Sequence, residues 1–213
     1  MSRSTKEKLI EAALDAFGEH GYDGAGLREI CKKAGVNNAA VNYHFGDKRG
    51  LYRAVLESLL EQSKCFPSPK LDGPPEERLR QLIRLNLVDI FKDRGQSHEK
   101  LIFREIAEPS EELREVVREP IRQNFEMFSA VVRALAPGQL SQEKVNLMVM
   151  SIFGQIDYYR MFYRFIPEVI GEQSAEELTL DTLTDHIAEF SIKAISSGLS
   201  HKDFGPTPPQ RRP

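Results

Sequence analysis

Apolar residues recur along this chain at the three- and four-residue spacing of a helix, and Gly, Pro or polar residues interrupt the repeats. The clearest case begins at residue 27, where four apolar residues would share one face of a short helix. These residues are Leu27, Ile30, Cys31 and Ala34. Gly35 follows at once, and Gly tolerates the positive φ on which many helices end. The pattern predicts a helix over Leu27–Ala34.

A second short helix and a longer one follow directly. Asn37 is a good N-cap, and Asn38–Phe45 can form a helix with Val41 turned inward. Gly46 ends this segment, and Asp47 then caps a helix that we expect to run from Lys48 to about Lys64. Two short helices joined by a tight Gly-containing turn make a helix-turn-helix, whose second helix enters the major groove of DNA.

The rest of the chain repeats the helical pattern between breaks. We expect further helices at Thr5–Glu19, Glu76–Asp93, from Ser97, from Ser110 with Pro120 kinking or splitting it, at Gln142–Phe165 and at Leu180–Leu199. No β-pattern of any length appears, so the sequence predicts an all-α fold. The breaks predict a helix-turn-helix domain (1–64), a linker (65–75), a larger helical domain (76–204) and a disordered Pro-rich tail (205–213).

Charge changes the picture only locally. The net charge is −3, which does not by itself indicate a nucleic-acid-binding protein. Between Gly26 and Arg53, however, six bases stand against two acids, and DNA binding needs a basic face and not a basic protein. The six bases are Arg28, Lys32, Lys33, Lys48, Arg49 and Arg53. No segment is long and apolar enough to span a membrane, and no signal-peptide core occurs, so we expect a cytoplasmic protein.

The sequence offers little catalytic chemistry. No P-loop, GxGxxG, HExxH or GxSxG motif occurs, and the His residues are scattered. Cys31 and Cys65 do not form a CxxC pair, which argues against zinc. Cys31 is most simply a small buried residue, and for Cys65 a thiol switch is the alternative to an inert thiol. We expect no catalytic residue, no metal and no cofactor.

A family resemblance rests on the helix-turn-helix and its flank. The block AGVNNAAVNYHFGDKRGLY (Ala34–Tyr52) resembles the DNA-binding domain of the TetR family of bacterial transcription repressors. The segment KLIEAALDAFGEHGYDG (Lys8–Gly24) is similar to the first helix of that family. The resemblance implies that the partner is a double-stranded DNA operator, and the candidate contact residues are Arg28, Asn37, Asn38, Ala39, Asn42, Tyr43, His44 and Lys48.

These candidates have different expected roles. Arg28 suits a phosphate contact, and so do the Tyr43 hydroxyl and the His44 imidazole. Asn can pair bidentately with adenine and Ala can touch a thymine methyl, which makes Asn38, Asn42 and Ala39 candidates for base reading. Lys48 would stand at a helix N-terminus, which attracts anions.

Two of these roles are open. Many TetR-family members carry Tyr at the position of Asn42, where it contacts the DNA backbone. Here the aromatic residue is the next one, Tyr43, so Asn42 either reads a base or holds a phosphate. Asn37 is either a DNA contact or only an N-cap.

The second domain shows a different pattern. Residues 142–165 are apolar on two sides, which indicates a helix buried on two sides. In the resembled family the last two long helices pair with their mates in a four-helix interface, which implies a homodimer formed here through Gln142–Phe165 and Leu180–Leu199. The segment REIAEPS (104–110) is part of a further similarity to the CecR-like branch.

The resemblance also implies that this domain binds a small-molecule inducer. An all-helical ligand pocket needs apolar walls and a few polar groups, and the candidate lining residues are Phe103, Phe125, Phe128, Phe153, Tyr158 and Phe162. The alternative for each of them is core packing or the dimer interface.

The favoured function is a ligand-released homodimeric repressor of a pseudo-palindromic operator, with activation left open. A helical enzyme or partner-binding module with an accessory helix-turn-helix is the first alternative. A sequence-indifferent DNA-organising protein is the second. The balanced charge of residues 1–63 argues against the second alternative, because non-specific binding relies on neutralising phosphates.

Overall fold

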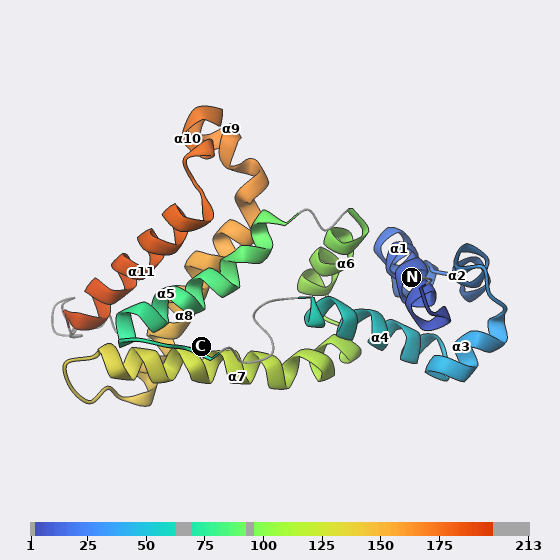
Figure 1. Ribbon diagram of the computed structural model, residues 1–213, viewed down its shortest axis with the longest axis horizontal. Helices are drawn as coiled ribbons and strands as arrows, with labels where there is room; N and C mark the ends of the chain where they lie inside the picture. Colours follow the sequence, from blue (N-terminus) through green and yellow to red (C-terminus); the bar gives the residue numbers. More distant parts are fainter. Residues whose placement is uncertain (1–2, 63–69, 93–95, 198–213) are drawn as a thin grey trace, which may run out of the picture. The chain divides into compact units, whose positions relative to one another are not determined.

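Helices make up all the regular structure of the residues that the computed structural model describes, which are 3–62, 70–92 and 96–197 (Figure 1). The chain divides into two compact units, residues 1–69 with 92–124 and residues 70–91 with 125–213. The all-α prediction is therefore confirmed. The Cys65 thiol and the expected tail lie outside the described residues.

The first unit contains the four N-terminal helices, α6 and the first part of α7. The helices are α1 (Thr5–Gly24), α2 (Leu27–Ala34), α3 (Asn38–Phe45), α4 (Lys48–Glu61), α6 (Gln96–Ala107) and α7 (Glu111–Leu135). Ser4 begins α1 with a capping box that uses the Glu7 side chain. Because α1 contacts α2, α3, α4 and α6, it is the central helix of this unit.

The core of the first unit forms where these helices meet α1. Its fully buried residues include Leu9, Ala13, Phe17, Ile30, Val41, Leu51, Tyr52, Val55, Leu56 and Leu101. Ile10 and Leu14 of α1 are only partly buried against this core. The helix is rotated so that Leu9 and Ala12 are buried.

A close approach of backbones brings α6 into the first unit. A Cβ on Gly18 of α1 would lie 2.4 Å from the Ser97 carbonyl oxygen of α6, so no larger residue fits there without a shift. The Lys100 ammonium also pairs with the Glu19 carboxylate at 2.7 Å. The expected linear boundary before residue 76 therefore does not coincide with the division of the structure into two units, since α6 packs with the N-terminal helices.

The second unit is built from α5, the second part of α7 and the C-terminal helices. These are α5 (Pro75–Leu87), η1 (Val88–Phe91), α8 (Gln142–Phe162), η2 (Tyr163–Phe165), α9 (Ile166–Ile170), α10 (Glu172–Glu176) and α11 (Leu180–Ser196). In Figure 1, α5 lies beside α11, and both helices contact α8. Their shared core includes Leu79, Leu82, Ile83, Phe128, Val132, Val145, Val149, Ile152, Leu183 and Ile187.

Several helix boundaries differ from the sequence prediction; for example, the helix expected over Glu76–Asp93 ends at Leu87 and is followed by η1. The first helix continues to Gly24, with a local break at Gly21. Pro120 does not split α7, which is one helix from Glu111 to Leu135. A proline removes only one backbone hydrogen bond and crowds one carbonyl, and the long flanking turns of α7 keep their own bonds. The segment after Phe162 is not part of α8 but forms η2, α9 and α10.

Candidate nucleic-acid interface

The turn between α2 and α3 is fixed by backbone geometry and one side chain. Gly35 adopts the left-handed conformation (φ 70°, ψ 34°), and the Val36 N–H donates to the Cys31 carbonyl at 3.0 Å. The Asn37 carboxamide oxygen accepts from the Ala40 N–H at 3.2 Å. Asn37 is therefore an N-cap in this structure, which was one of its two expected roles.

The short helix α3 divides into an inner and an outer side. Val41 is buried in the core of the first unit, and Ala40 and Phe45 pack against that core. Asn38, Ala39 and Asn42 are exposed, and Tyr43 is 85% exposed. The expected reading residues thus share the solvent side of a rigidly anchored helix, as DNA contact requires.

Aromatic contacts hold the C-terminal end of α3. The rings of Tyr43 and His44 meet edge to face with centroids 4.9 Å apart, and the His44 ring lies 6.0 Å from that of Phe45. Both Tyr43 and His44 remain exposed to solvent. Their polar atoms are therefore available to a phosphate.

Lys48 is held by the α1–α2 corner. Its ammonium donates to the Asp23 carbonyl at 3.3 Å and lies 4.9 Å from the centroid of the Tyr22 ring. Asp47 caps α4 by accepting from the Gly50 N–H at 2.8 Å. Lys48 is therefore a positioned cation at the helix N-terminus, and not a freely moving one.

The other bases of residues 26–53 fall into two groups. Arg28 and Lys32 are exposed and form no ion pair with any residue that the structure describes. Lys33 instead pairs with Asp15 of α1 at 2.7 Å. The basic face consequently has fewer unpaired bases than the six counted in the sequence.

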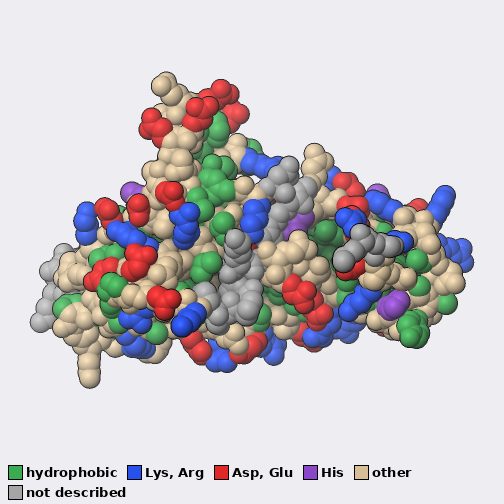
Figure 2. Space-filling view, viewed as in Figure 1, with side chains coloured by type: hydrophobic (Ala, Val, Ile, Leu, Met, Phe, Trp, Pro, Cys, Tyr) green, Lys and Arg blue, Asp and Glu red, His purple; other side chains and the backbone are tan. Residues whose placement is uncertain are grey.

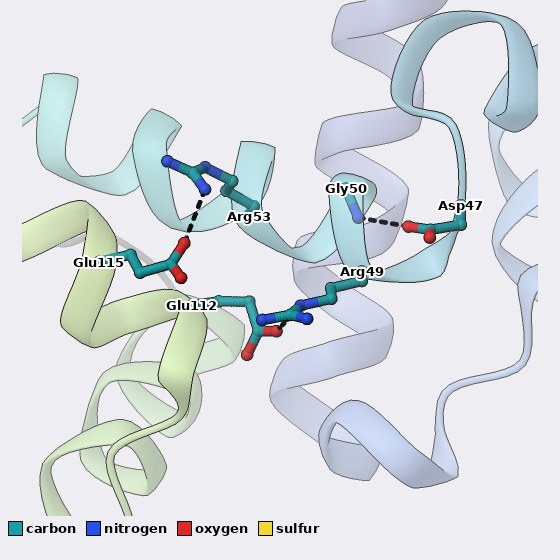
Figure 3. Close-up of a pocket in the computed structure, with 6 residues that line it drawn as sticks. All are labelled: Asp47, Arg49, Gly50, Arg53, Glu112 and Glu115. Carbon is teal, nitrogen blue, oxygen red and sulfur yellow. Dashed lines mark hydrogen bonds and ion pairs between the residues drawn. The ribbon is translucent and has the colours of Figure 1, made fainter.

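Two further bases pair with the start of α7, around a shallow polar pocket of about 330 Å³ (Figure 3). Arg49 pairs with Glu112, and also with Glu111 at 3.2 Å. Arg53 reaches Glu115 at 2.8 Å. The hydrogen bond that Arg49 donates to the Glu112 carboxylate raises the pKa of Arg49 above its ordinary value.

Glu111 and Glu112 lie in the first turn of α7, where acids favour the helix dipole. Glu112 is also a partner of Arg49. The sequence carries no signal for the contact, because the two residues are 63 positions apart.

A buried carboxylate links α4 to the corner between α6 and α7. Glu105 is only 3% exposed, and it accepts a hydrogen bond from the Tyr52 hydroxyl. It also accepts from the N–H and the hydroxyl of Ser110, both at 2.9 Å. Burial, and then the hydrogen bond to Glu105, raise the pKa of Tyr52 well above its ordinary value. The sequence analysis identified the REIAEPS segment, which contains Glu105, but it did not predict the hydrogen bond between Glu105 and Tyr52.

The six expected ligand-lining residues do not gather in one place. Phe103 belongs to the first unit and is exposed. In the second unit, the Phe153 ring lies 5.0 Å from Phe128 and 6.2 Å from Phe125. The remaining two, Tyr158 and Phe162, form an exposed pair with ring centroids 5.3 Å apart. Their role in ligand binding stays a prediction.

Helix α8 keeps an apolar face in solvent, and α11 exposes one large apolar side chain. On α8 this outer face carries Leu147, Met150, Tyr158, Met161 and Phe162, with Phe165 just beyond the helix. On α11 the exposed side chain is Phe190, whose ring lies 6.4 Å from that of His186. The two-sided pattern of residues 142–165 thus corresponds to one face in the core and one in solvent. Figure 2 shows acidic side chains gathered over the neighbouring α9 and α10.

The described part of the chain places no group of three or more His, Cys, Asp or Glu residues that could hold a metal ion. None of its helices is long and apolar enough to cross a membrane. Cys31 is buried, and burial raises the pKa of its thiol.

Comparisons with known proteins agree with this geometry. Residues 9–55 match the bacterial regulatory proteins of the tetR family, and residues 75–195 match the C-terminal domain of the HTH-type transcriptional dual regulator CecR. CecR of Shigella flexneri is 27% identical over 219 residues, which cover 93% of this chain and 94% of that protein. The HTH-type transcriptional regulator RutR of Escherichia coli K12 is 24% identical over 195 residues, covering 89% and 90%.

A solved structure shows the same fold. A TetR-like transcriptional regulator from Rhodococcus sp. RHA1 superposes with a TM-score of 0.63 at 16% identity, covering 92% of this chain and 98% of that one. The curated relatives are named as transcriptional regulators.

Proposed function

Because this chain belongs to the TetR family of transcriptional regulators and is a DNA-binding regulator, we propose that it acts as a homodimeric repressor released from its operator by a small molecule. The observation that carries the proposal is the solvent side of α3. Four exposed residues there, Asn38, Ala39, Asn42 and Tyr43, project from a helix that Val41 anchors in the core.

In the proposed complex, α3 lies in the major groove and its neighbours hold the phosphates. Asn42 reads a base edge, because its carboxamide is exposed and the adjacent Tyr43 supplies the backbone contact. Arg28 and Lys32 of α2 bind phosphates on one side of the groove, and Lys48 binds one at the start of α4. Asn37 contributes by capping α3, since its side-chain oxygen is already occupied by the Ala40 N–H.

A dimer would bind two half-sites. The supporting observations are the outer apolar face of α8 and the exposed Phe190 of α11, which a second copy of the chain would cover in a twofold arrangement. Each subunit would place one α3 in a major groove, and half-site centres would be one helical turn apart, roughly 34 Å, or a small multiple of this. The operator would then be pseudo-palindromic, and the protein would act in the cytoplasm, where that DNA lies.

Release requires a ligand that prefers the DNA-incompetent state. A coupling of about 1–3 kcal/mol is typical of such linkage. We place the ligand in the second unit beside Phe125, Phe128 and Phe153, because the Phe153 ring lies against both of the other two rings. The exposed Phe103, Tyr158 and Phe162 have weaker support as lining residues. The proposal contains no catalytic step.

Fluorescence anisotropy on the intergenic DNA flanking its own gene, against random duplex at a stated salt concentration, tests the proposal. We expect saturable preference for one site at two subunits per duplex. Asn42→Ala should change the ranking of operator variants, because a lost base contact costs roughly 1–3 kcal/mol at one position only. The matched control is Gln155→Ala on α8, far along the chain from the helix-turn-helix, and it should leave the ranking unchanged.

Two results would contradict parts of this proposal. An equal loss on every operator variant would give Asn42 a backbone role. Indistinguishable affinity for intergenic and random DNA, followed by no enrichment from a random-sequence library, would reject sequence-specific binding. A reporter gene under the recovered site separates repression from activation, since repression predicts higher expression when the protein is absent.

A further inference from the structure

A continuous chain of contacts runs through the first unit from the α6–α7 corner to Lys48. It starts at Ser110, whose hydroxyl caps α7 by accepting from the Leu113 N–H at 3.0 Å. The same residue donates to Glu105 from both its N–H and its hydroxyl. Glu105 in turn accepts from the Tyr52 hydroxyl of α4. The buried carboxylate therefore ties α4 to the start of α7.

Aromatic contacts extend this series of contacts from Tyr52 to Tyr22 and Lys48. Its ring is fully buried and meets that of Tyr22 edge to face, with centroids 5.0 Å apart. Phe17 closes the group, with its ring 4.7 Å from that of Tyr52. The Tyr22 ring also contacts Lys48, whose ammonium lies 4.9 Å from the ring centroid. Each link is a direct contact between side chains.

The same segment of α6 also touches the backbone that carries Tyr22. A Cβ on Gly21 would lie 2.8 Å from an Arg104 guanidinium nitrogen, and Gly21 has φ +71°. Arg104 thus lies against the backbone at Gly21, next to Tyr22, and its neighbour Glu105 is linked to the Tyr22 ring through Tyr52. Asp23, from the same corner, supplies the carbonyl that Lys48 donates to.

These contacts restrict Lys48 before any DNA is present. A lysine side chain loses conformational entropy when it is fixed on a phosphate, and a side chain already held loses less on binding. The direction of the Tyr52 hydroxyl is set by Glu105, because a buried hydroxyl that loses its partner must find another or shift. A shift of Tyr52 would move the Tyr22 ring, and with it the surface on which Lys48 rests.

We propose that Glu105 is a positioning residue for DNA binding, which acts through Tyr52 and Tyr22 to hold Lys48 where it meets a phosphate. The inference rests on the proposed phosphate contact of Lys48. It assigns the buried Glu105 a role in affinity, and not only in the stability of the first unit.

The test is a double-mutant cycle on DNA binding. Glu105→Gln, Tyr52→Phe and Lys48→Met are measured alone and combined, on the duplex that the wild-type protein selects from a random-sequence library. Lys48→Met should weaken binding about tenfold and lower the salt slope by about 0.9 per subunit. Glu105→Gln and Tyr52→Phe should each weaken binding about 3- to 10-fold, with a smaller salt slope. Neither should weaken it further in the Lys48→Met protein.

Leu101→Val is the matched control for lost stability. Leu101 is fully buried in α6 but outside the contact chain, so this variant should lower the melting temperature and keep the wild-type affinity. Tyr52→Phe removes only a hydroxyl, which keeps the cycle measurable if Glu105→Gln fails to fold.

The outcomes separate the two claims. Equal losses from Glu105→Gln with and without Lys48 would overturn the positioning role, and so would a lower melting temperature with unchanged affinity. Unchanged affinity and salt slope in Lys48→Met would reject the phosphate contact itself, and the inference with it. Non-additive losses with a shared fall in salt slope would support both.

Discussion

Truncating one side chain on the outer face of α8 tests the proposed dimer quantitatively. Met150 is 58% exposed and Leu147, one turn earlier, is 56% exposed. Complete burial of such a side chain stabilises by about 1.5–3 kcal/mol, so covering the exposed half of Met150 would contribute about 1 kcal/mol. A twofold interface counts each substitution twice. Met150→Ala should therefore weaken the dimer by about 2 kcal/mol, or roughly 30-fold in Kd.

The assay is sedimentation velocity over a dilution series that spans the dimer Kd. Ile121→Ala is the matched control, because Ile121 on α7 is 53% exposed and its truncation removes a similar apolar side chain. This control should leave the dimer Kd unchanged. Circular dichroism melting of both variants confirms that any dissociation occurs between folded subunits.

The reasoning fails if Met150→Ala dimerises as tightly as the wild type while the wild type dissociates on dilution. It fails equally if Ile121→Ala weakens the dimer as much, since the loss would then not be specific to α8. A protein that stays monomeric at all concentrations would remove the dimer from the proposed function.

Three further predictions concern the first unit. Gly35→Ala should destabilise the protein by about 1–2 kcal/mol in chemical unfolding. Gly35 has φ +70° and open space around it, so the added methyl group would meet no neighbour and the cost would come only from the left-handed backbone of the alanine. An unchanged unfolding midpoint would contradict this. Because the pKa of Tyr52 is raised, its contribution to stability is complete below the ordinary tyrosine pKa of about 10 and is lost as pH rises beyond it; Tyr52→Phe should therefore lose less stability between pH 9 and about 11 than the wild type. In a Cys65→Ser protein, Cys31 should react with a thiol reagent only on unfolding, because it is buried with a raised thiol pKa; rapid labelling of the native protein would refute its burial.

The parts of the fold that local chemistry decides could be predicted from the sequence. The bounds of α2 and α3 agree with the prediction, because their ends depend on Gly35, Asn37 and Gly46, which act on the adjacent backbone. The cap of α4 by Asp47 is equally local. By contrast, α9 and α10 have five residues each, which is too short for an apolar period to appear.

The contacts between distant segments could not be predicted in this way. Glu105 is a polar residue in an amphipathic stretch, and its burial depends on contacts with distant segments, such as its hydrogen bond from Tyr52 of α4. Periodicity identified both faces of α8 as apolar, but it could not say which face packs within the chain. In the structure Val145 and Val149 face the core, and Leu147 and Met150 face solvent.

The salt dependence of DNA binding measures which bases face the DNA. Counting bases in the sequence gives six per subunit between residues 26 and 53, whereas in the structure Lys33, Arg49 and Arg53 are paired with acids. If Arg28, Lys32 and Lys48 make the phosphate contacts, a dimer should show a log–log salt slope of roughly −5, against about −11 if all six contribute. A slope near the larger value would mean that the Lys33 pair with α1 and the Arg49 and Arg53 pairs with α7 all open on DNA.

Glu112→Gln tests the pairing of Arg49 by changing its acidic partner. The substitution removes one carboxylate from Arg49 and leaves only the exposed Glu111 at 3.2 Å. The guanidinium then pairs more readily with a phosphate, so affinity should rise and the slope should steepen by up to about 0.9 per subunit. Glu189→Gln on α11 removes an equal charge from an exposed site in the second unit, and it should change neither quantity. Equal effects of the two substitutions would show that net charge alone, and not the pairing of Arg49, sets the affinity.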